Sequence, residues 1–222
     1  MPPSPRTRVK RVHQRGAYDR ATLDAILDAG MLCHIGYVYD GYPVVTPTLY
    51  WREGDHVYWH GSSASRMLRA NEGAQVCFTV THLDGLVLAR SAFHHSANFR
   101  SVMLFGTATR VETDETKTAR LKAFVDGLYP ARWDALRPMN AQELKATTIL
   151  SMPIDEASAK VRAGGPKDDA EDMETPVWAG VVPLNVTLGA PEADPETAQS
   201  THGLPQINPR AFGPRLAFPD AA

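Results

Sequence analysis

The stretch that decides the fold is His56-Val-Tyr-Trp-His-Gly-Ser-Ser-Ala-Ser-Arg-Met-Leu68. It predicts a strand that ends in a hydroxyl-rich turn, followed by a short helix with Arg66 in its first turn. Free backbone N–H groups, the helix dipole, serine hydroxyls and a guanidinium would converge there, and that combination suits a phosphate. Ser62, Ser63 and Ser65 can equally be ordinary turn and capping residues. Taken alone, the pattern favours this plain interpretation, so a phosphate site needs support from elsewhere.

Around this stretch, runs rich in β-branched and aromatic residues are separated by turn signals. The first two runs, 31–39 and 42–52, are joined by Asp40-Gly41, a dipeptide that favours a tight hairpin. Further strands are predicted at 74–81, 86–91, 100–111, 148–153 and 157–162. The early connections are too short for crossover helices, so the strands are antiparallel. The sequence predicts a mainly β fold, a small closed or partly open barrel with peripheral helices, because closure removes exposed strand edges.

Three helices are predicted at the periphery of the barrel. One covers 20–29 behind an Asp19 cap, one runs to about residue 128 behind an Asp114 cap, and a short one lies near 141–147. Composition divides the chain into a basic N-terminal arm (1–17), a barrel domain (18–163) and a Pro-rich C-terminal extension (164–222) that we expect to pack on the barrel or on a partner subunit.

Composition also narrows the function classes. The 222 residues carry a formal net charge of −2, which gives no support to nucleic-acid binding. No apolar run is long enough to span a membrane, and no secretory signal is present. Cys33 and Cys77 lie in apolar runs without metal-ligand spacing, which favours two buried thiols over a disulfide. We therefore expect a soluble, cytoplasmic protein.

The segment Val44-Val-Thr-Pro-Thr-Leu-Tyr50 holds a proline inside a strand pattern. Pro47 removes a ladder donor, which indicates an edge, a bulge or a place where the backbone faces a ligand. Thr46 and Thr48 flank it on one face. These hydroxyls could meet the polar edge of a flavin ring, and a simple bulge in an edge strand has comparable weight.

The segment Arg90 to Ser101 is a polar loop between two apolar strands and could supply hydrogen-bond donors to a ligand. His94 and His95 are adjacent and point to opposite sides of an extended chain, so they do not form a paired metal site, and no metal is predicted. The chain lacks a nucleophile elbow, a Walker loop and a dinucleotide-binding glycine motif.

In order and spacing, these motifs resemble those of the pyridoxamine 5'-phosphate oxidase-like split-barrel flavoproteins, and in particular their flavin-nucleotide-binding branch with the Nim-type nitroimidazole resistance proteins. The resemblance rests on His60-Gly-Ser-x-x-Ser-Arg66, on Phe99-Arg-Ser-Val-Met-Leu-Phe-Gly106 and on Lys160-Val-Arg-x-Gly-x-Pro with Val177–Leu184. It covers about residues 18 to 184.

The resemblance implies a homodimer with FMN at the subunit interface. Ser65-Arg66 matches the pair that binds the FMN phosphate, with Gly61 and Ser62 in the same turn. Arg100-Ser101 matches an Arg-Gln pair near the flavin, although serine has a shorter reach than glutamine. His60 falls where Nim-type proteins place their active-site histidine, and Trp178 is a candidate for closing the site.

The resemblance also has departures. The C-terminal Arg-x-His that grips pyridoxal phosphate in the oxidases is absent, so true pyridoxamine-phosphate oxidase activity is not expected. The leading hypothesis is an FMN-dependent oxidoreductase of a small molecule, such as a nitro compound or a quinone. The alternative is a non-catalytic carrier or sensor of flavin or haem, with His94 or His95 as an axial ligand. Deazaflavin is a further cofactor that related barrels bind.

Overall fold

The computed structural model describes residues 2–196, 203–204 and 206–208 of the chain. Within them lie ten strands, namely β1 (Gly16–Ala17), β2 (Leu32–Tyr39), β3 (Tyr42–Glu53), β4 (His56–Ser62), β5 (Gln75–Leu88), β6 (Ser96–Thr107), β7 (Thr109–Arg110), β8 (Thr147–Pro153), β9 (Ala157–Arg162) and β10 (Gly180–Pro183). The α-helices are α1 (Arg20–Asp28), α2 (Arg66–Asn71), α3 (Asp114–Leu128) and α4 (Ala141–Ala146). Short 3-10 helices occupy η1 (His13–Arg15), η2 (Ala92–His94), η3 (Trp133–Ala135) and η4 (Ala170–Asp172).

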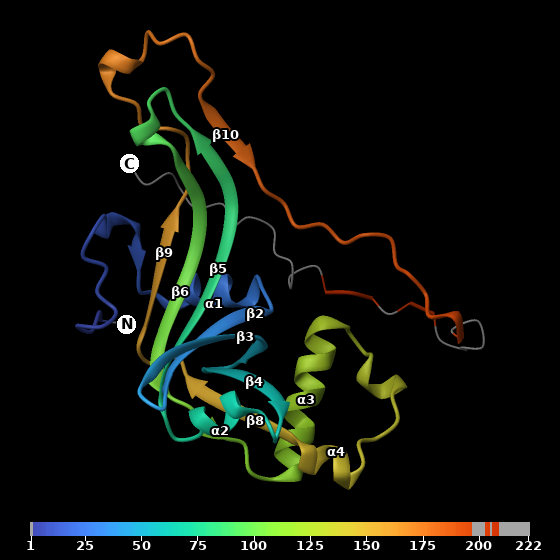
Figure 1. The fold of residues 1–222 in the computed structure, drawn as a ribbon. Coiled ribbons are helices and arrows are strands. Elements are labelled where there is room, and N and C mark those ends of the chain that lie inside the picture. The colour runs from blue at the N-terminus through green and yellow to red at the C-terminus, as the bar shows by residue number, and fades with distance from the viewer. Residues whose placement is uncertain (1, 197–202, 205, 209–222) are drawn as a thin grey trace.

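The strands form one curved sheet in the order β1-β9-β6-β5-β2-β3-β4-β8-β7, with β10 added to β5 (Figure 1). Every strand pairing within the described residues is antiparallel, as the short connections predict. The chain passes from β6 to β7 through the buried Ala108, yet β7 pairs with β8 at the other end of the strand order. This crossing brings the two ends of the sheet together, and the predicted split barrel is confirmed.

The turn and cap residues act as their chemistry predicts. Asp40 and Gly41 both have positive φ, 49° and 79°, as the tight turn between β2 and β3 requires. Asp19 accepts a hydrogen bond from the backbone N–H of Thr22 and caps α1. In α3 the cap is Thr113, one residue before the predicted Asp114, and its hydroxyl accepts from the N–H of Thr116.

Two sequence predictions about the middle of the chain are wrong. Residues Gln75–Leu88 form one long strand, β5, where two strands (74–81 and 86–91) and a turn are predicted. The turn signal at Asp84-Gly85 is absorbed by a β-bulge between Leu83 and Gly85, because β6 and β10 pair on both sides of it. The predicted polar loop is also shorter than expected, since β6 already begins at Ser96.

The β5–β6 hairpin extends beyond the barrel as an arm, and the segment after β9 returns along it to form β10 (Figure 1). The short apolar run predicted at 177–184 becomes this strand. Part of the predicted C-terminal extension, 197–202, 205 and 209–222, lies outside the described residues, and the two predicted domain boundaries stay predictions. No helix in the described part of the chain is long and apolar enough to cross a membrane.

The barrel encloses the main core, where α1 adds Leu23, Ile26 and Leu27 to inward side chains such as Trp59 and Phe78. A second core lies on the other side of β3, β4 and β8, where α3 covers it. Its buried members are Trp51, Tyr58, Leu121 and Ile149. The strands β3 and β4 therefore bury side chains on both faces.

The side of β3, β2, β5, β6 and β9 that faces away from the main core, which we call the outer face, has a different character. Strand register places six apolar side chains there that are 41 to 69% exposed, namely Leu32, Val38, Val45, Leu49, Leu83 and Met103. Exposed apolar groups spread over one sheet face in this way are a common feature of interaction surfaces.

Candidate functional site

The predicted phosphate turn has the expected backbone. Ser65 precedes α2 in an extended conformation, and its hydroxyl makes no capping hydrogen bond. Arg66 is exposed, and its guanidinium carbon lies 5.1 Å from the centre of the Tyr39 ring. No carboxylate within the described residues pairs with Arg66. Because α2 has only six residues, its dipole adds little, and Arg66 itself supplies the positive charge.

Thr46 and Thr48 lie half-buried on the inner side of β3, while Pro47 between them is exposed on the outer face. The Thr46 hydroxyl is 3.3 Å from the hydroxyl of Tyr37. Tyr37 and Tyr39 are two residues apart on β2 and so point to the same side of it. Thr46 lies next to Tyr37, and Arg66 lies over Tyr39. Thr46 and the Ser65–Arg66 turn are therefore on the same side of β2.

Arg100 and Ser101 point to opposite sides of β6. Arg100 is only 4% exposed, and its Nε and Nη2 donate to the Asp84 carboxylate at 2.9 and 2.8 Å. Ser101 lies on the outer face and donates to the carbonyl oxygen of Lys160 at 3.3 Å. The guanidinium of Arg100 is therefore engaged within the chain, whereas Ser101 is half-buried on the outer face.

His60 lies under α3, on the side of β4 away from the main core. Its ring centre is 4.9 Å from that of Phe124 and 5.9 Å from that of Trp51. Its Nδ1 is buried and has no hydrogen-bond partner among the described residues. Burial lowers the pKa of His60, so the imidazole is neutral at pH 7. The structure thus places His60 in an aromatic environment under α3, while Gly61 and Ser62 continue toward the Ser65–Arg66 turn.

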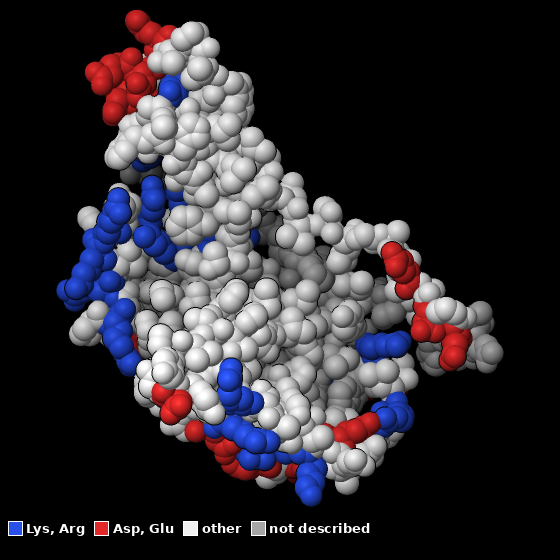
Figure 2. All heavy atoms as spheres, viewed as in Figure 1, with Lys and Arg blue, Asp and Glu red and all other residues white. Residues whose placement is uncertain are grey.

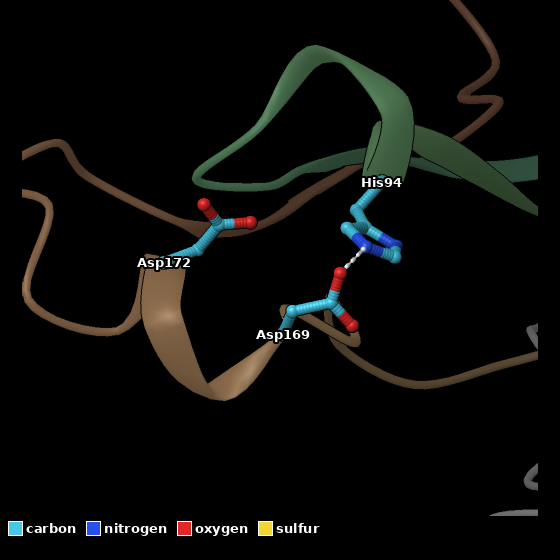
Figure 3. A group of neighbouring side chains, drawn as sticks. All are labelled: His94, Asp169 and Asp172. Atoms are coloured by element: carbon cyan, nitrogen blue, oxygen red, sulfur yellow. Dashed lines mark hydrogen bonds and ion pairs between the residues drawn. The ribbon is translucent and has the colours of Figure 1, made fainter.

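The two adjacent histidines on the arm have different partners. The Nε2 of His94 lies 3.1 Å from Asp169, and Asp172 is close by, so that one ligand atom from each residue falls within 4.8 Å of the others (Figure 3). Sequence reasoning considered only the histidine pair and missed these carboxylates, which come from a distant segment. Exposed acidic groups are common on protein surfaces without a metal, and we assign no metal centre here.

The Nδ1 of His95 lies 2.9 Å from the carbonyl oxygen of Ser91. A carbonyl can only accept, so Nδ1 carries the proton and Nε2 keeps its lone pair free. Beside it, Phe93 is 90% exposed. Trp178, the predicted closing residue, is also on the arm, where it is 64% exposed and packs over Gly180 of β10. His95, Phe93 and Trp178 lie on the arm, far along the strands from the Ser65–Arg66 turn. One chain alone therefore does not bring all the predicted site residues together.

Comparison with known proteins supports this description of the fold. The family model described as pyridoxamine 5'-phosphate oxidase matches residues 19–161. No curated protein matches the chain. Among solved structures, the flavocytochrome Anf3 from Azotobacter vinelandii is 49% identical with a TM-score of 0.86, and the match covers 97% of this chain and 99% of that one.

Two further structures extend the comparison. The FAD and haem binding protein from Mycobacterium smegmatis is 40% identical, with a TM-score of 0.81 and coverage of 86% of this chain and 94% of that one. A 5-nitroimidazole antibiotic resistance protein from Bacteroides thetaiotaomicron, described as putative, is 21% identical with a TM-score of 0.55, covering 66% of this chain and 86% of that one, and shows the shared fold alone. On the family match and the two similar full-length structures, the chain belongs to the pyridoxamine 5'-phosphate oxidase family of split-barrel proteins.

Proposed function

We propose that this protein binds both a flavin and a haem and acts as a redox protein of the flavocytochrome type. The observation that carries the proposal is the match to a flavocytochrome over nearly the whole of both chains at 49% identity. The second relative, at 40% identity, is named for FAD and haem together. The flavin and haem that sequence reasoning treats as alternatives are, in this proposal, bound together.

The residues suited to the flavin lie at the Ser65–Arg66 turn and on β3. Arg66 offers a guanidinium that no carboxylate of the described chain neutralises, and the Ser65 hydroxyl is free of a capping bond. Thr46 and Thr48 offer hydroxyls on the neighbouring strand. The name of the M. smegmatis relative favours FAD over the FMN predicted from sequence, and over deazaflavin. A bound flavin supplies hydride and electron transfer, and the chain supplies its position and charge environment.

A second copy of the chain is part of the proposal. The outer face exposes apolar side chains from four strands, and the arm carries Phe93 and Trp178 in exposed positions. A homodimer that buries these surfaces would also bring arm residues of one copy to the barrel of the other. The predicted role of Trp178 in closing the site depends on such a partner copy.

For the haem, His95 has the geometry of a metal ligand. Metal-binding histidines usually donate their second ring N–H to a carbonyl or carboxylate, which fixes the ring and leaves the other nitrogen for the metal. His95 does this through Ser91, whereas the Nε2 of His94 is directed at Asp169. Phe93, whose ring lies 5.2 Å from that of His94, is exposed in the same loop and offers an apolar contact to a planar ligand. His95 would therefore be the residue that holds the haem iron.

The test begins with the absorption spectrum of the full chain purified after expression with added haem precursor. A flavin band and a Soret band together are expected, and chromatography of the released cofactor distinguishes FAD from FMN. In His95→Ala the Soret band should shift or disappear, while the matched variant His94→Ala should keep it. A colourless protein that takes up neither cofactor would contradict the proposal, and an unchanged Soret band in His95→Ala would refute the ligand assignment.

The finer activity, reduction of a small nitro compound or quinone in the cytoplasm, rests on the sequence resemblance. Anaerobic mixing of the loaded protein with NADH or NADPH, followed by a panel of nitroimidazoles and quinones, tests it. Bleaching of the flavin by a donor and its reoxidation by a panel member are expected. If no donor bleaches the flavin, the carrier or sensor role replaces the reductase role.

A further inference from the structure

Arg162, at the end of β9, is a buried cation without an anionic partner among the described residues. It is 7% exposed, and its Nη1 and Nη2 donate only to neutral groups, namely the Asn98 side-chain oxygen and the carbonyl oxygens of Gly164 and Gly165. Its Nε is buried and has no partner. Buried charges in proteins are normally balanced, because an unpaired charge removed from water is costly. Arg100, the other buried arginine of this region, follows that rule through Asp84.

Two further positively charged side chains, those of Arg15 and Lys160, lie near Arg162. Arg15 is close enough that its charge, together with burial, lowers the pKa of Arg162. Lys160 stands two residues before Arg162 on β9, on the outer face, and pairs in register with Gly16, the neighbour of Arg15. Within the described chain, neither Arg15 nor Lys160 forms an ion pair with a carboxylate. Figure 2 shows basic side chains gathered on this side of the molecule and acidic ones at the tip of the arm.

We propose that Arg162, Arg15 and Lys160 form a binding site for a phosphoryl group at the base of the arm, which we call the neck site. A guanidinium with a free N–H and two further cations matches a phosphate dianion or a diphosphate. The site lies at the end of the outer face, next to Phe99 and Ser101 in the strand register. A phosphoryl group there supplies the negative charge that the buried Arg162 lacks.

The phosphoryl group has two possible sources. One is the adenosine-side phosphate of FAD bound across the homodimer interface, with the flavin-side phosphate on the Ser65–Arg66 turn of the other copy, in which case the neck site deepens, and rests on, the proposed flavin binding. The other is a separate phosphorylated ligand, whose binding does not require a flavin. Both sources share the same recognition chemistry, so the experiment is built to separate them.

The variant Arg15→Ala/Lys160→Ala removes two charges and leaves the buried Arg162 and its contacts in place. The matched control is Arg8→Ala/Lys10→Ala, which removes two exposed charges from the same N-terminal segment. Arg162→Met serves as a second test variant, with circular dichroism as the check on its fold. The measurement is calorimetric titration of the flavin-stripped full chain with inorganic pyrophosphate, repeated with FAD and with FMN.

Wild type is expected to bind pyrophosphate, and the Arg15/Lys160 variant to bind it about tenfold or more weakly, since each lost charge-assisted contact is worth about that factor. The control should match wild type. Absence of pyrophosphate binding in wild type, or equal weakening in the control, would overturn the proposal. If the Arg15/Lys160 variant also binds FAD more weakly but binds FMN as tightly as wild type, the phosphoryl group comes from FAD. If only its pyrophosphate binding is weaker, the phosphoryl group belongs to a separate ligand. A chain that binds pyrophosphate but no flavin would keep the neck site and refute the proposed function.

Discussion

At the scale of single residues, Arg66 and Arg100 show that the ion-pair partner of an arginine decides whether its guanidinium is available to a ligand. Both arginines follow from the sequence pattern as candidate ligand groups. The carboxylate of Asp84 engages Arg100, whereas Arg66 lies over the face of Tyr39 and pairs with no carboxylate of the described residues. The sequence cannot reveal this difference, because Asp84 reaches Arg100 only through the bulge that reshapes β5.

Arg66→Ala is expected to weaken flavin binding about 10- to 100-fold, because one or two charge-assisted hydrogen bonds to the phosphate are lost. The overall fold should persist, since Arg66 is exposed. Fluorescence quenching during flavin titration measures the effect. Lys145→Ala, which removes an exposed charge from α4, is the matched control. An Arg66→Ala protein that purifies with a full complement of flavin would exclude Arg66 from the phosphate site.

His60 illustrates a second limit of sequence reasoning. Strand alternation shows that His60 and Tyr58 share a face, but it does not show which face is the barrel interior when both faces are buried. The second core under α3 decides this, and it depends on packing between segments far apart in sequence. The burial of Arg162 escaped prediction for the same reason.

The stability of the protein should fall as the pH drops from about 7 to about 5. Burial lowers the pKa of His60, and burial with the nearby Arg100 lowers that of His82, whereas in the unfolded chain both histidines protonate near the ordinary pKa of 6.5. As the pH falls, the unfolded state therefore binds more protons than the folded state. The contribution of the two histidines to the unfolding free energy is complete above about pH 6.5, and it is lost as the pH falls toward their pKa values in the folded protein.

Urea unfolding at a series of pH values measures this dependence. In His60→Phe, an aromatic ring still packs against Trp51 and Phe124, and the slope of unfolding free energy against pH between about 5 and 7 should be smaller than in wild type. His82 keeps its share of the slope. An identical slope in wild type and His60→Phe would show that His60 does not resist protonation.

At the scale of secondary structure, the local rules predicted most elements and failed where neighbours override them. The Asp40-Gly41 hairpin and the capped α1 are specified by residues within each element. The Asp84-Gly85 turn signal is equally strong locally, but β6 and β10 hold the chain extended through it. Sequence alone does not show that a strand from residues 180–183 will occupy the edge of β5.

Gly85 makes this edge strand possible. A β-carbon at Gly85 would lie 3.1 Å from both Val181 Cγ1 and Val182 O, which is closer than normal packing allows. Gly85→Val should therefore loosen β10 and destabilise the protein by about 1–3 kcal/mol. Limited proteolysis should cut the segment after β9 faster than in wild type.

Gly127→Ala in α3 is the control for this change, because open space surrounds the added carbon. It should leave the proteolysis pattern unchanged. It should also stabilise the protein by about 0.5–1 kcal/mol, which is measured as a slightly higher melting temperature. If Gly85→Val is cleaved no faster than wild type, β10 does not depend on close approach at Gly85.

At the scale of the whole molecule, the outer face and the arm define the expected assembly. Light scattering should give twice the chain mass. Val38→Lys/Met103→Lys places two charges on the outer face and should shift the protein toward monomer with lower flavin content, because a buried unpaired charge is costly. Leu136→Lys, the same change at an exposed leucine outside the outer face, should leave the dimer intact. A monomeric wild type that holds its full flavin would refute the homodimer proposal.

The order of strands in the barrel has a consequence for the protein during its synthesis. One of the two partners of β4 is β8, and one of the two partners of β6 is β9, so each of these pairs joins an early segment to a late one. While the ribosome makes the intervening chain, on the order of ten seconds, a nascent half-barrel has no closing strands over Trp59 and Phe78. Release of the chain before β8 emerges should leave an aggregation-prone fragment, and chaperone binding to the nascent chain should end only when β8 and β9 have left the ribosome.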